Sequence, residues 1–303
     1  RERLLLERYC GFGGLKCILN PARELADAVH WAKSDLELFA PTVELHRLIR
    51  ENSKNESEYK QLMDSLKQSV LTAFYTPSAV TEALTDVLKE HQIIPEKVLE
   101  PSAGIGAFVD SVLDNNPKAD IMAFEKDLLT GKILRHLHPE QKVRIEGFEK
   151  IEKPFNDYFD LAISNIPFGD VAVFDPSYTA MKGMRALVTR RIHNYFFVKA
   201  LDTVRDGGLV AFITSQGVLN AKNNSAARFM MLYHADLVSA IRLPNNLFTE
   251  NANTEVGSDL IILQKNTQKE SLRGDDNLLD TVYNDENRIP TNNYFLEHPE
   301  RII

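Results

Sequence analysis

The chain has 303 residues, of which 44% are hydrophobic and 26% are charged. These proportions are typical of a folded globular protein with room for one large domain and an appendage. The net charge of −8 excludes a protein that holds nucleic acid through overall charge alone. No apolar run approaches the roughly 18 residues that cross a bilayer, and the first residues are too charged for a signal peptide. The sequence therefore predicts a cytoplasmic protein.

Residues 1–72 have the apolar spacing of amphipathic helices and predict a helical amino-terminal region. Helices are expected at 22–29, 43–49 and 58–71. Cys10 and Cys17 lie in this region without a CxxC spacing or a nearby pair of histidines. We predict that they are reduced thiols and that the chain has no metal ligands.

Residues 73–265 alternate between strand and helix patterns, beginning with a helix at 78–89. Strands are expected at 98–99, 121–124, 143–145, 161–163, 209–213, 238–241 and 260–263, with helices at 107–113, 128–137 and 194–205. This alternation predicts an α/β domain built on a seven-stranded, mostly parallel sheet with helices on both faces. The composition turns polar after residue 265, so residues 266–303 are predicted to be a linker or tail leading to a further recognition or helicase region.

The turn Asn165-Ile166-Pro167-Phe168 follows the apolar strand at 159–163. Ligands of open α/β sheets bind outside the carboxyl ends of the strands. The Asn165 oxygen and a nearby backbone carbonyl can accept the two hydrogens of a nucleobase amino group, and Phe168 can stack on the base. The pattern favours methyl transfer to an exocyclic nitrogen. Its alternative is an ordinary strand-to-loop turn, which uses the same residue types.

A glycine loop at 99–108 lies between an expected strand and helix. Gly104 and Gly106 allow a sharp turn and a close approach of the backbone to a ligand. The third glycine of a dinucleotide motif and the Lys-Ser/Thr ending of a P-loop are both missing. Glu125, after the next strand, is well placed to accept both ribose hydroxyls of a nucleoside. A tight turn and a helix-capping acid are the bland alternatives.

The segment 176–201 contains no acidic residue in an otherwise acidic chain. Its cations follow the Asn165 turn and predict a loop that contacts DNA phosphates; they are Lys182, Arg185, Arg190, Arg191 and Lys199. The alternative is a solvated helix face. Phe248 can pack against a flipped base, or it can simply cover the sheet edge.

With these motifs in this order, the chain resembles the S-adenosylmethionine-dependent DNA methyltransferases that modify adenine N6. It is similar above all to the large methylase and methylase–helicase proteins of phages and bacterial mobile elements. A glycine loop ahead of the catalytic turn is that family's gamma-type arrangement, and Phe74-Tyr75-Thr76-Pro77 resembles its first cofactor motif. The resemblance implies a Rossmann-like methyltransferase fold.

The resemblance also implies roles for individual residues. Catalysis falls to the turn of Asn165, Ile166, Pro167 and Phe168, with Ile166 where the wider family has proline. S-adenosylmethionine is expected to contact Thr76, Glu100, Pro101, Ser102, Ala103, Gly104, Gly106, Phe108, Glu125, Lys126, Gly147, Phe148 and Asn165. Lys182, Arg185, Arg190, Arg191 and Phe248 are expected to contact DNA.

The implied partner is adenine-containing duplex DNA, with the target base flipped out for reaction. A separate target-recognition domain or subunit is also implied, since none is recognisable before residue 303. Two alternatives stay open. The same turn suits RNA adenine or a protein glutamine amide, and the domain can also be a non-catalytic cofactor-binding module of a larger protein.

Overall fold

The computed structural model describes residues 15–72, 76–181, 183–247, 257–272, 274–283 and 290–303, together with residues 3, 6, 7, 9 and 12. Phe248, Lys182, Cys10 and the pair Phe74-Tyr75 lie outside the described residues. No helix in the described part of the chain is long and apolar enough to cross a membrane.

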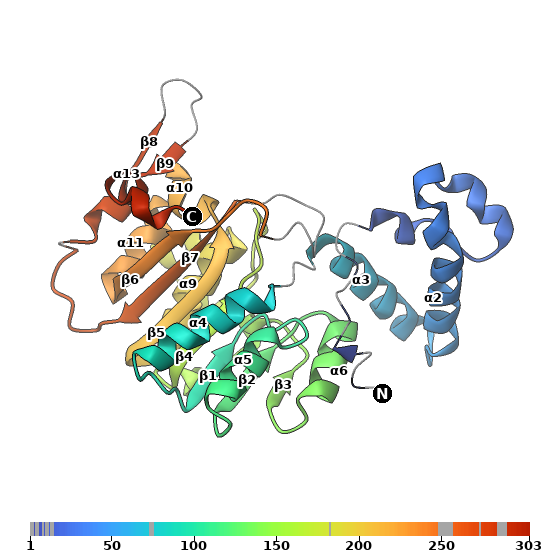
Figure 1. Ribbon diagram of the computed structural model, residues 1–303, viewed down its shortest axis with the longest axis horizontal. Helices are drawn as coiled ribbons and strands as arrows, with labels where there is room; N and C mark the ends of the chain where they lie inside the picture. The colour runs from blue at the N-terminus through green and yellow to red at the C-terminus, as the bar shows by residue number, and fades with distance from the viewer. Residues whose placement is uncertain are drawn as a thin grey trace.

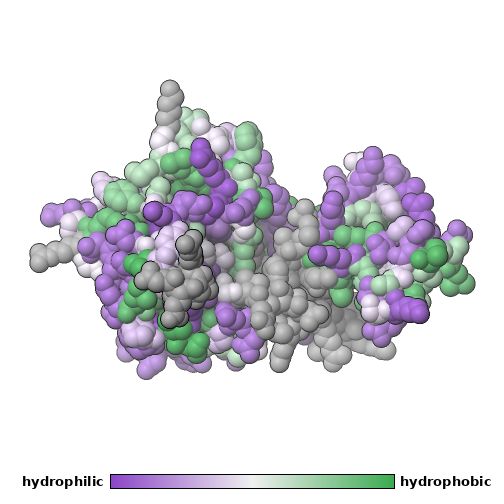
Figure 2. Space-filling view, turned by 90° about the horizontal axis from the view of Figure 1, so that it is seen from above, coloured by the Kyte–Doolittle hydropathy of each residue, from purple (hydrophilic) through white to green (hydrophobic). Residues whose placement is uncertain are grey.

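The amino-terminal region is helical, as predicted. It contains η1 (Lys16–Leu19), η2 (Leu25–His30), η3 (Lys33–Leu38), α2 (Phe39–Glu51) and α3 (Glu56–Thr72). A small core of its own holds it together, in which Trp31 meets Phe39 edge to face at 5.3 Å. The region stands beside the sheet domain, with α3 reaching toward α6 (Figure 1). Figure 2 shows hydrophobic surface at its outer end, and Leu25 and Val29 are the most exposed large apolar side chains of the described residues.

The sheet has the predicted seven strands. They are β1 (Lys97–Glu100), β2 (Asp120–Phe124), β3 (Lys142–Arg144), β4 (Phe159–Asn165), β5 (Val204–Ser215), β6 (Ala235–Arg242) and β7 (Ser258–Lys265). Their order is β3-β2-β1-β4-β5-β7-β6, and all neighbours are parallel except that β7 runs antiparallel to β5 and β6. From β1 the chain continues to β2 and β3 on one side of the sheet, and from β4 it continues to β5, β6 and β7 on the other side. The strand order therefore reverses between the central strands β1 and β4.

Helices cover both faces of the sheet (Figure 1). On one face lie α4 (Ser78–Glu90), α5 (Ala107–Asn115) and α6 (Leu128–Leu137), whose apolar side chains share a core with Val98, Ile121 and Leu161. On the other lie α9 (Ile192–Thr203) and α11 (Ser225–His234), packed on Leu99, Met122 and Ala162. Successive strand side chains point to opposite faces, which is why one short apolar run can serve both cores. The shorter helices are η4 (Phe148–Lys150), η5 (Lys153–Phe155), α7 (Pro176–Thr179), α8 (Met184–Val188), α10 (Gly217–Asn220) and η6 (Lys222–Asn224).

The described part of the carboxyl-terminal tail packs onto the domain and does not form the predicted linker. It contains η7 (Asp276–Leu278), β8 (Thr281–Tyr283), β9 (Pro290–Asn292), α13 (Asn293–Glu297) and η8 (Pro299–Arg301). Leu278, Tyr294 and Phe295 join the larger core, while the buried Asn292 amide donates to the carbonyls of Leu219 and Leu278. The prediction failed because single apolar residues spread through a polar stretch produce no periodic signal.

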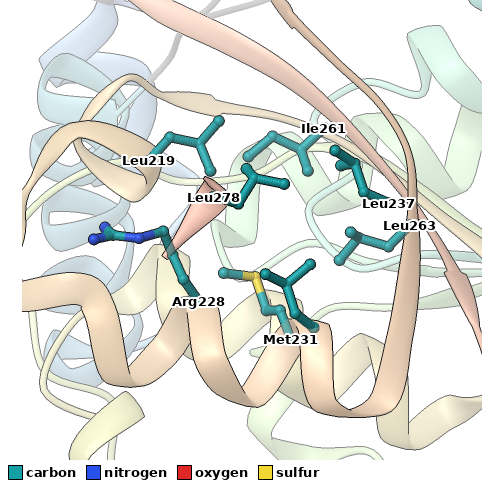
Figure 3. Close-up of a pocket in the computed structure, with 8 residues that line it drawn as sticks. Leu219, Arg228, Met231, Leu237, Ile261, Leu263 and Leu278 are labelled. Atoms are coloured by element: carbon teal, nitrogen blue, oxygen red, sulfur yellow. The ribbon is translucent and has the colours of Figure 1, made fainter. Parts of the chain in front are cut away.

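Arg228 ties this tail to α11. Its guanidinium is buried and donates to the carbonyls of Val218, Ala221 and Leu279 at 3.1, 2.8 and 2.8 Å. A cavity of about 10 Å³ lies beside its aliphatic stem, lined by Leu219, Arg228, Met231, Leu232, Leu237, Ile261, Leu263 and Leu278 (Figure 3). A space this small holds at most about one water molecule, so we assign it to packing.

Replacing Arg228 by methionine is expected to lower the free energy of unfolding by about 3 kcal/mol, because one buried and two partly buried carbonyls lose their donor. Urea denaturation measures this loss. Arg23→Met, at an exposed position, is the control and is expected to change stability by less than about 0.5 kcal/mol. Equal stability of the two variants would contradict a structural role for the guanidinium.

Candidate functional site

The carboxyl ends of β1, β2 and β4 form the edge at which the predicted site residues meet. Val98 pairs with Leu161 and Leu99 with Ala162, so Glu100 and Asn165 end adjacent parallel strands. By strand alternation, Asn165 continues the row of Leu161 and Ile163, and Glu100 continues the row of Val98. The Ser164 hydroxyl lies 3.5 Å from the carbonyl of Ser102, which links the end of β4 to the glycine loop directly. This edge is the reversal point of the strand order, where open α/β sheets bind ligands.

The glycine loop requires both of its glycines. Gly104 and Gly106 have φ angles of +57° and +102°, in the region that side chains disfavour. A Cβ on Gly106 would also lie 2.5 Å from Nε2 of His138, a buried neighbour that sequence reasoning missed because it is remote in the chain. Ala103 donates its amide to the Phe124 carbonyl of β2 at 2.8 Å. The loop is therefore held in a defined shape against β2.

Three residues that were predicted to contact the cofactor have buried side chains that stabilise the loop. Pro101 and Ala103 are buried, and the Phe108 ring is enclosed in the core under α5. Ser102 and Thr76 are only partly buried, with Thr76 just ahead of α4. The loop thus leaves Ser102 and backbone groups, more than apolar side chains, to meet a ligand.

Glu125 joins the glycine loop to the turn after β2. Its Oε2 accepts the Gly104 amide at 2.9 Å, and its Oε1 accepts the Asp127 amide at 2.7 Å. Burial raises the pKa of this carboxyl to about 7. The neighbouring Lys126 side chain points outward and is 79% exposed. Glu125 is the acid that the structure orients toward the loop.

Glu100, one of the residues predicted to contact the cofactor, is a fully buried acid at this edge. Its side chain is 1% exposed, and no described residue donates a hydrogen bond of full geometry to either carboxyl oxygen, although the Ser164 hydroxyl and the Ser102 amide lie close enough to interact with it. Burial raises its pKa to about 8, and the charge of Glu125 adds to that shift, which Ser164 and the Ser102 amide oppose only in part. A buried acid without a full hydrogen bond is costly unless a ligand completes it. The two carboxyl groups of this edge, Glu100 and Glu125, therefore suit a ligand that carries a cationic group and a diol.

The turn after β4 is held by its backbone. The Ile166 amide donates to the Ile213 carbonyl of β5 at 3.0 Å, and the Ile166 side chain is buried. Phe168 is partly buried and packs against the core beneath α4 and α5. Gly169 follows with a φ of +125°, which turns the chain sharply away. Asn165 and the Ile166 carbonyl thus belong to a turn anchored at two strands.

Phe148 does not offer a ring to a ligand in this structure. It is 1% exposed and packs against Phe124 and Phe196 with ring centroids 5.8 and 5.3 Å apart. Gly147 is closely approached, since a Cβ there would lie 2.1 Å from Oε2 of Glu149. Only the backbone of the Gly147-Phe148 turn remains a candidate contact for an adenine ring.

Most of the described cations of the basic segment are neutralised by acids that flank it in sequence. Arg185 makes two hydrogen bonds to Asp202, at 2.6 and 2.9 Å. Lys199 pairs with the buried Asp175 at 3.1 Å, and Arg191 pairs with Asp170 at 2.9 Å. Arg190 is exposed and makes no ion pair with any described residue. Among the described cations, Arg190 is therefore the one left available for a phosphate contact, while Lys182 lies outside the described residues.

Comparisons with known proteins agree with this geometry. A family model described as N-6 DNA Methylase matches residues 57–299. The chain is 29% identical over 201 residues to the defense against restriction protein B of Escherichia phage P1, covering 64% of this chain and 8% of that protein. It is 25% identical over 173 residues to the type II methyltransferase M.XamI of Xanthomonas campestris pv. amaranthicola, covering 53% of this chain and 33% of that protein. The chain thus spans a minor part of either relative.

The fold has solved counterparts. A modification subunit of a putative type I restriction enzyme from Vibrio vulnificus YJ016 superposes with a TM-score of 0.54 at 17% identity. The match covers 76% of this chain and 53% of that one. At this identity the likeness concerns the fold, and it agrees with the predicted Rossmann-like arrangement.

Proposed function

The chain belongs to the N-6 DNA methylase family, and from this premise we propose that it methylates the exocyclic N6 of adenine in DNA, using S-adenosylmethionine, within a modification system. The observation that carries the proposal is the buried carboxyl of Glu100, to which no described residue donates a hydrogen bond of full geometry, at the strand edge that also holds Glu125 and Asn165. A buried acid with so few donors, a second acid on the glycine loop and a carboxamide on the neighbouring strand suit a cofactor and an amine side by side.

The cofactor side of the site uses charge and hydrogen bonding. Glu100 is suited to the ammonium of the methionyl group, because a buried carboxylate with so few donors gains most from a cation. Glu125 would accept the ribose hydroxyls, and the backbone of Gly104 and Gly106 allows close approach. The bound cofactor supplies a sulfonium methyl that is already electrophilic.

On the substrate side, the chain's own groups prepare the nitrogen. The Asn165 oxygen and the Ile166 carbonyl would accept the two amino hydrogens and favour a tetrahedral, nucleophilic nitrogen. The bond from the Ile166 amide to Ile213 fixes the direction of this peptide, so isoleucine in place of proline leaves the carbonyl available. Phe168 would stack on the flipped base, worth about 1–3 kcal/mol.

The connector between the turn and α9 would meet the remaining DNA. Because α9 runs directly into β5 at the amino edge of the sheet, its first turn lies at the carboxyl edge with Asn165. The Val173 amide donates to the Thr189 carbonyl at 2.8 Å. This bond places the next residues, Phe174 and Arg190, on adjacent segments of the chain. Phe174 is 77% exposed, more than any other described aromatic ring. An exposed apolar ring near Arg190, which makes no ion pair with a described residue, suits a duplex with a displaced base.

Arg190→Gln is expected to weaken DNA binding about threefold at moderate salt and to reduce the salt dependence of affinity by about one counterion. Fluorescence anisotropy across a salt series measures both. Lys118→Gln, an equal loss of charge next to the amino end of β2, is the control and is expected to bind like wild type. Identical salt slopes for both variants would remove Arg190 from the DNA surface.

The decisive assay incubates the chain with labelled S-adenosylmethionine and, separately, unmethylated genomic DNA, RNA and a protein mixture. N6-methyladenine in the DNA is the expected product. Label in RNA adenine or in protein glutamine would replace the proposed substrate. Calorimetry without any binding of the cofactor would reduce the chain to a non-catalytic module.

A further inference from the structure

The helical amino-terminal region contacts the sheet domain next to Glu125. Ser65, on α3, is 6% exposed and points its hydroxyl at the turn between β2 and α6. We propose that Ser65 is a positioning residue for the cofactor site, so that docking of the amino-terminal region and cofactor binding are coupled. This inference rests on the function proposed above, since it assigns Glu125 to the cofactor.

A continuous set of hydrogen bonds connects Ser65 to the glycine loop. The Ser65 hydroxyl donates to Oδ2 of Asp127 and accepts the Leu129 amide at 3.2 Å. Oδ1 of Asp127 caps α6 by accepting the Thr130 amide at 2.7 Å. The Asp127 amide donates to Glu125 at 2.7 Å, and the other oxygen of Glu125 accepts the Gly104 amide. Each step is a direct contact, and the last of them reaches the Gly104 amide of the glycine loop.

The hydroxyl of Ser65 serves as both donor and acceptor, so no apolar side chain can replace it. Without it, one oxygen of Asp127 and the Leu129 amide lose their partner in a partly buried contact, and the turn can relax toward water. The neighbouring Leu66 and Val70 of α3 pack within the amino-terminal core instead. Ser65 therefore joins the two parts by polar contacts that converge on one site.

Coupling of this kind is reciprocal. A docked α3 would hold Glu125 in place for the cofactor, and the cofactor would in turn favour the docked α3. We expect saturating S-adenosylmethionine to slow hydrogen exchange at the Leu129 and Thr130 amides. The same ligand would leave the rate of hydrogen exchange in the amino-terminal core around Trp31 unchanged.

The test compares Ser65→Ala with Ser69→Ala. Ser69 is also buried on α3, but its hydroxyl accepts the Phe12 amide within the amino-terminal region. Ser65→Ala is expected to raise the Kd and KM for S-adenosylmethionine about three- to tenfold, with kcat at saturation within about twofold of wild type. Ser69→Ala is expected to leave both constants unchanged. In an Asp127→Ala background, Ser65→Ala is expected to add less than about twofold.

The outcomes separate this inference from the proposed function. Wild-type protein that does not bind S-adenosylmethionine would overturn the function itself. Cofactor binding by wild type, with equal Kd values for Ser65→Ala and Ser69→Ala, would overturn only the coupling, whether both variants are weakened or neither is.

Discussion

Asn165→Ala is expected to lower kcat for adenine methylation by about 10³-fold while leaving the Kd for S-adenosylmethionine within about twofold of wild type. In the proposed mechanism the carboxamide oxygen accepts a hydrogen bond from the amine, and alanine offers no atom in its place. The backbone bond from Ile166 to Ile213 does not involve the side chain, so the turn keeps its shape. Single-turnover kinetics with labelled cofactor, together with calorimetry, separates chemistry from binding.

A matched control is Asn116→Ala, which removes a carboxamide at the end of α5, where its amide donates to the Pro95 carbonyl at 2.9 Å. Its kcat is expected to equal that of wild type. An Asn165→Ala protein with comparable kcat would refute the role of this residue. A protein that loses cofactor binding as well would assign Asn165 to the cofactor instead.

Glu100→Gln is expected to affect stability and binding in opposite directions. The folded pKa of about 8 lies above the roughly 4.3 of an unfolded glutamate, so between these values the folded protein holds the proton more tightly. The contribution of Glu100 to the free energy of unfolding therefore falls as pH rises from about 4 to about 8. Glutamine removes this dependence and is expected to stabilise the ligand-free protein at pH 8.5 by roughly 3–5 kcal/mol.

The same change is expected to weaken S-adenosylmethionine binding about 30- to 100-fold, because the ammonium of the cofactor would lose the carboxylate proposed to bind it. Urea denaturation at pH 6 and pH 8.5 measures the first effect, and calorimetry measures the second. Glu125, with a pKa raised to about 7, contributes a pH dependence of the same sign that persists in the variant. Destabilisation of Glu100→Gln at pH 8.5 would show that the carboxylate has a structural partner.

The two variants address different halves of one edge. Asn165→Ala tests the acceptor for the amine, and Glu100→Gln tests the acid for the cofactor. A chain in which both behave as expected would bind the cofactor through β1 and act on its substrate through β4. If only one of the two variants shows its expected effect, the other variant identifies the half of the proposal that is wrong.

Local patterns predicted the sheet and the placement of its motifs. Short apolar runs marked β1, β2, β4 and β5, and the motifs follow those strands in order. Since parallel strands end at one edge, the meeting of Glu100 with the Asn165 turn could be anticipated from the sequence. The need for Gly104 and Gly106 followed from the backbone freedom that only glycine has.

Contacts between residues more than a few positions apart account for what local patterns did not predict. Asp202, Asp175 and Asp170 stand just outside the basic segment, yet they neutralise Arg185, Lys199 and Arg191. A charge run describes composition, while the availability of each cation depends on which acids the fold brings against it. Phe148 likewise belongs to an aromatic cluster that no local pattern identifies.

The amino-acid sequence by itself determined the family, the order of the strands' motifs and the residue types at the candidate site, because these depend on neighbours within a few positions. Only the tertiary structure decided that Glu100 is buried, that Arg190 makes no ion pair with a described residue and that Ser65 reaches the turn of Glu125. Burial and charge pairing depend on the environment that distant segments create when they pack. Local motifs therefore supply the residue types of the candidate site, and the fold determines their burial and their charge pairing.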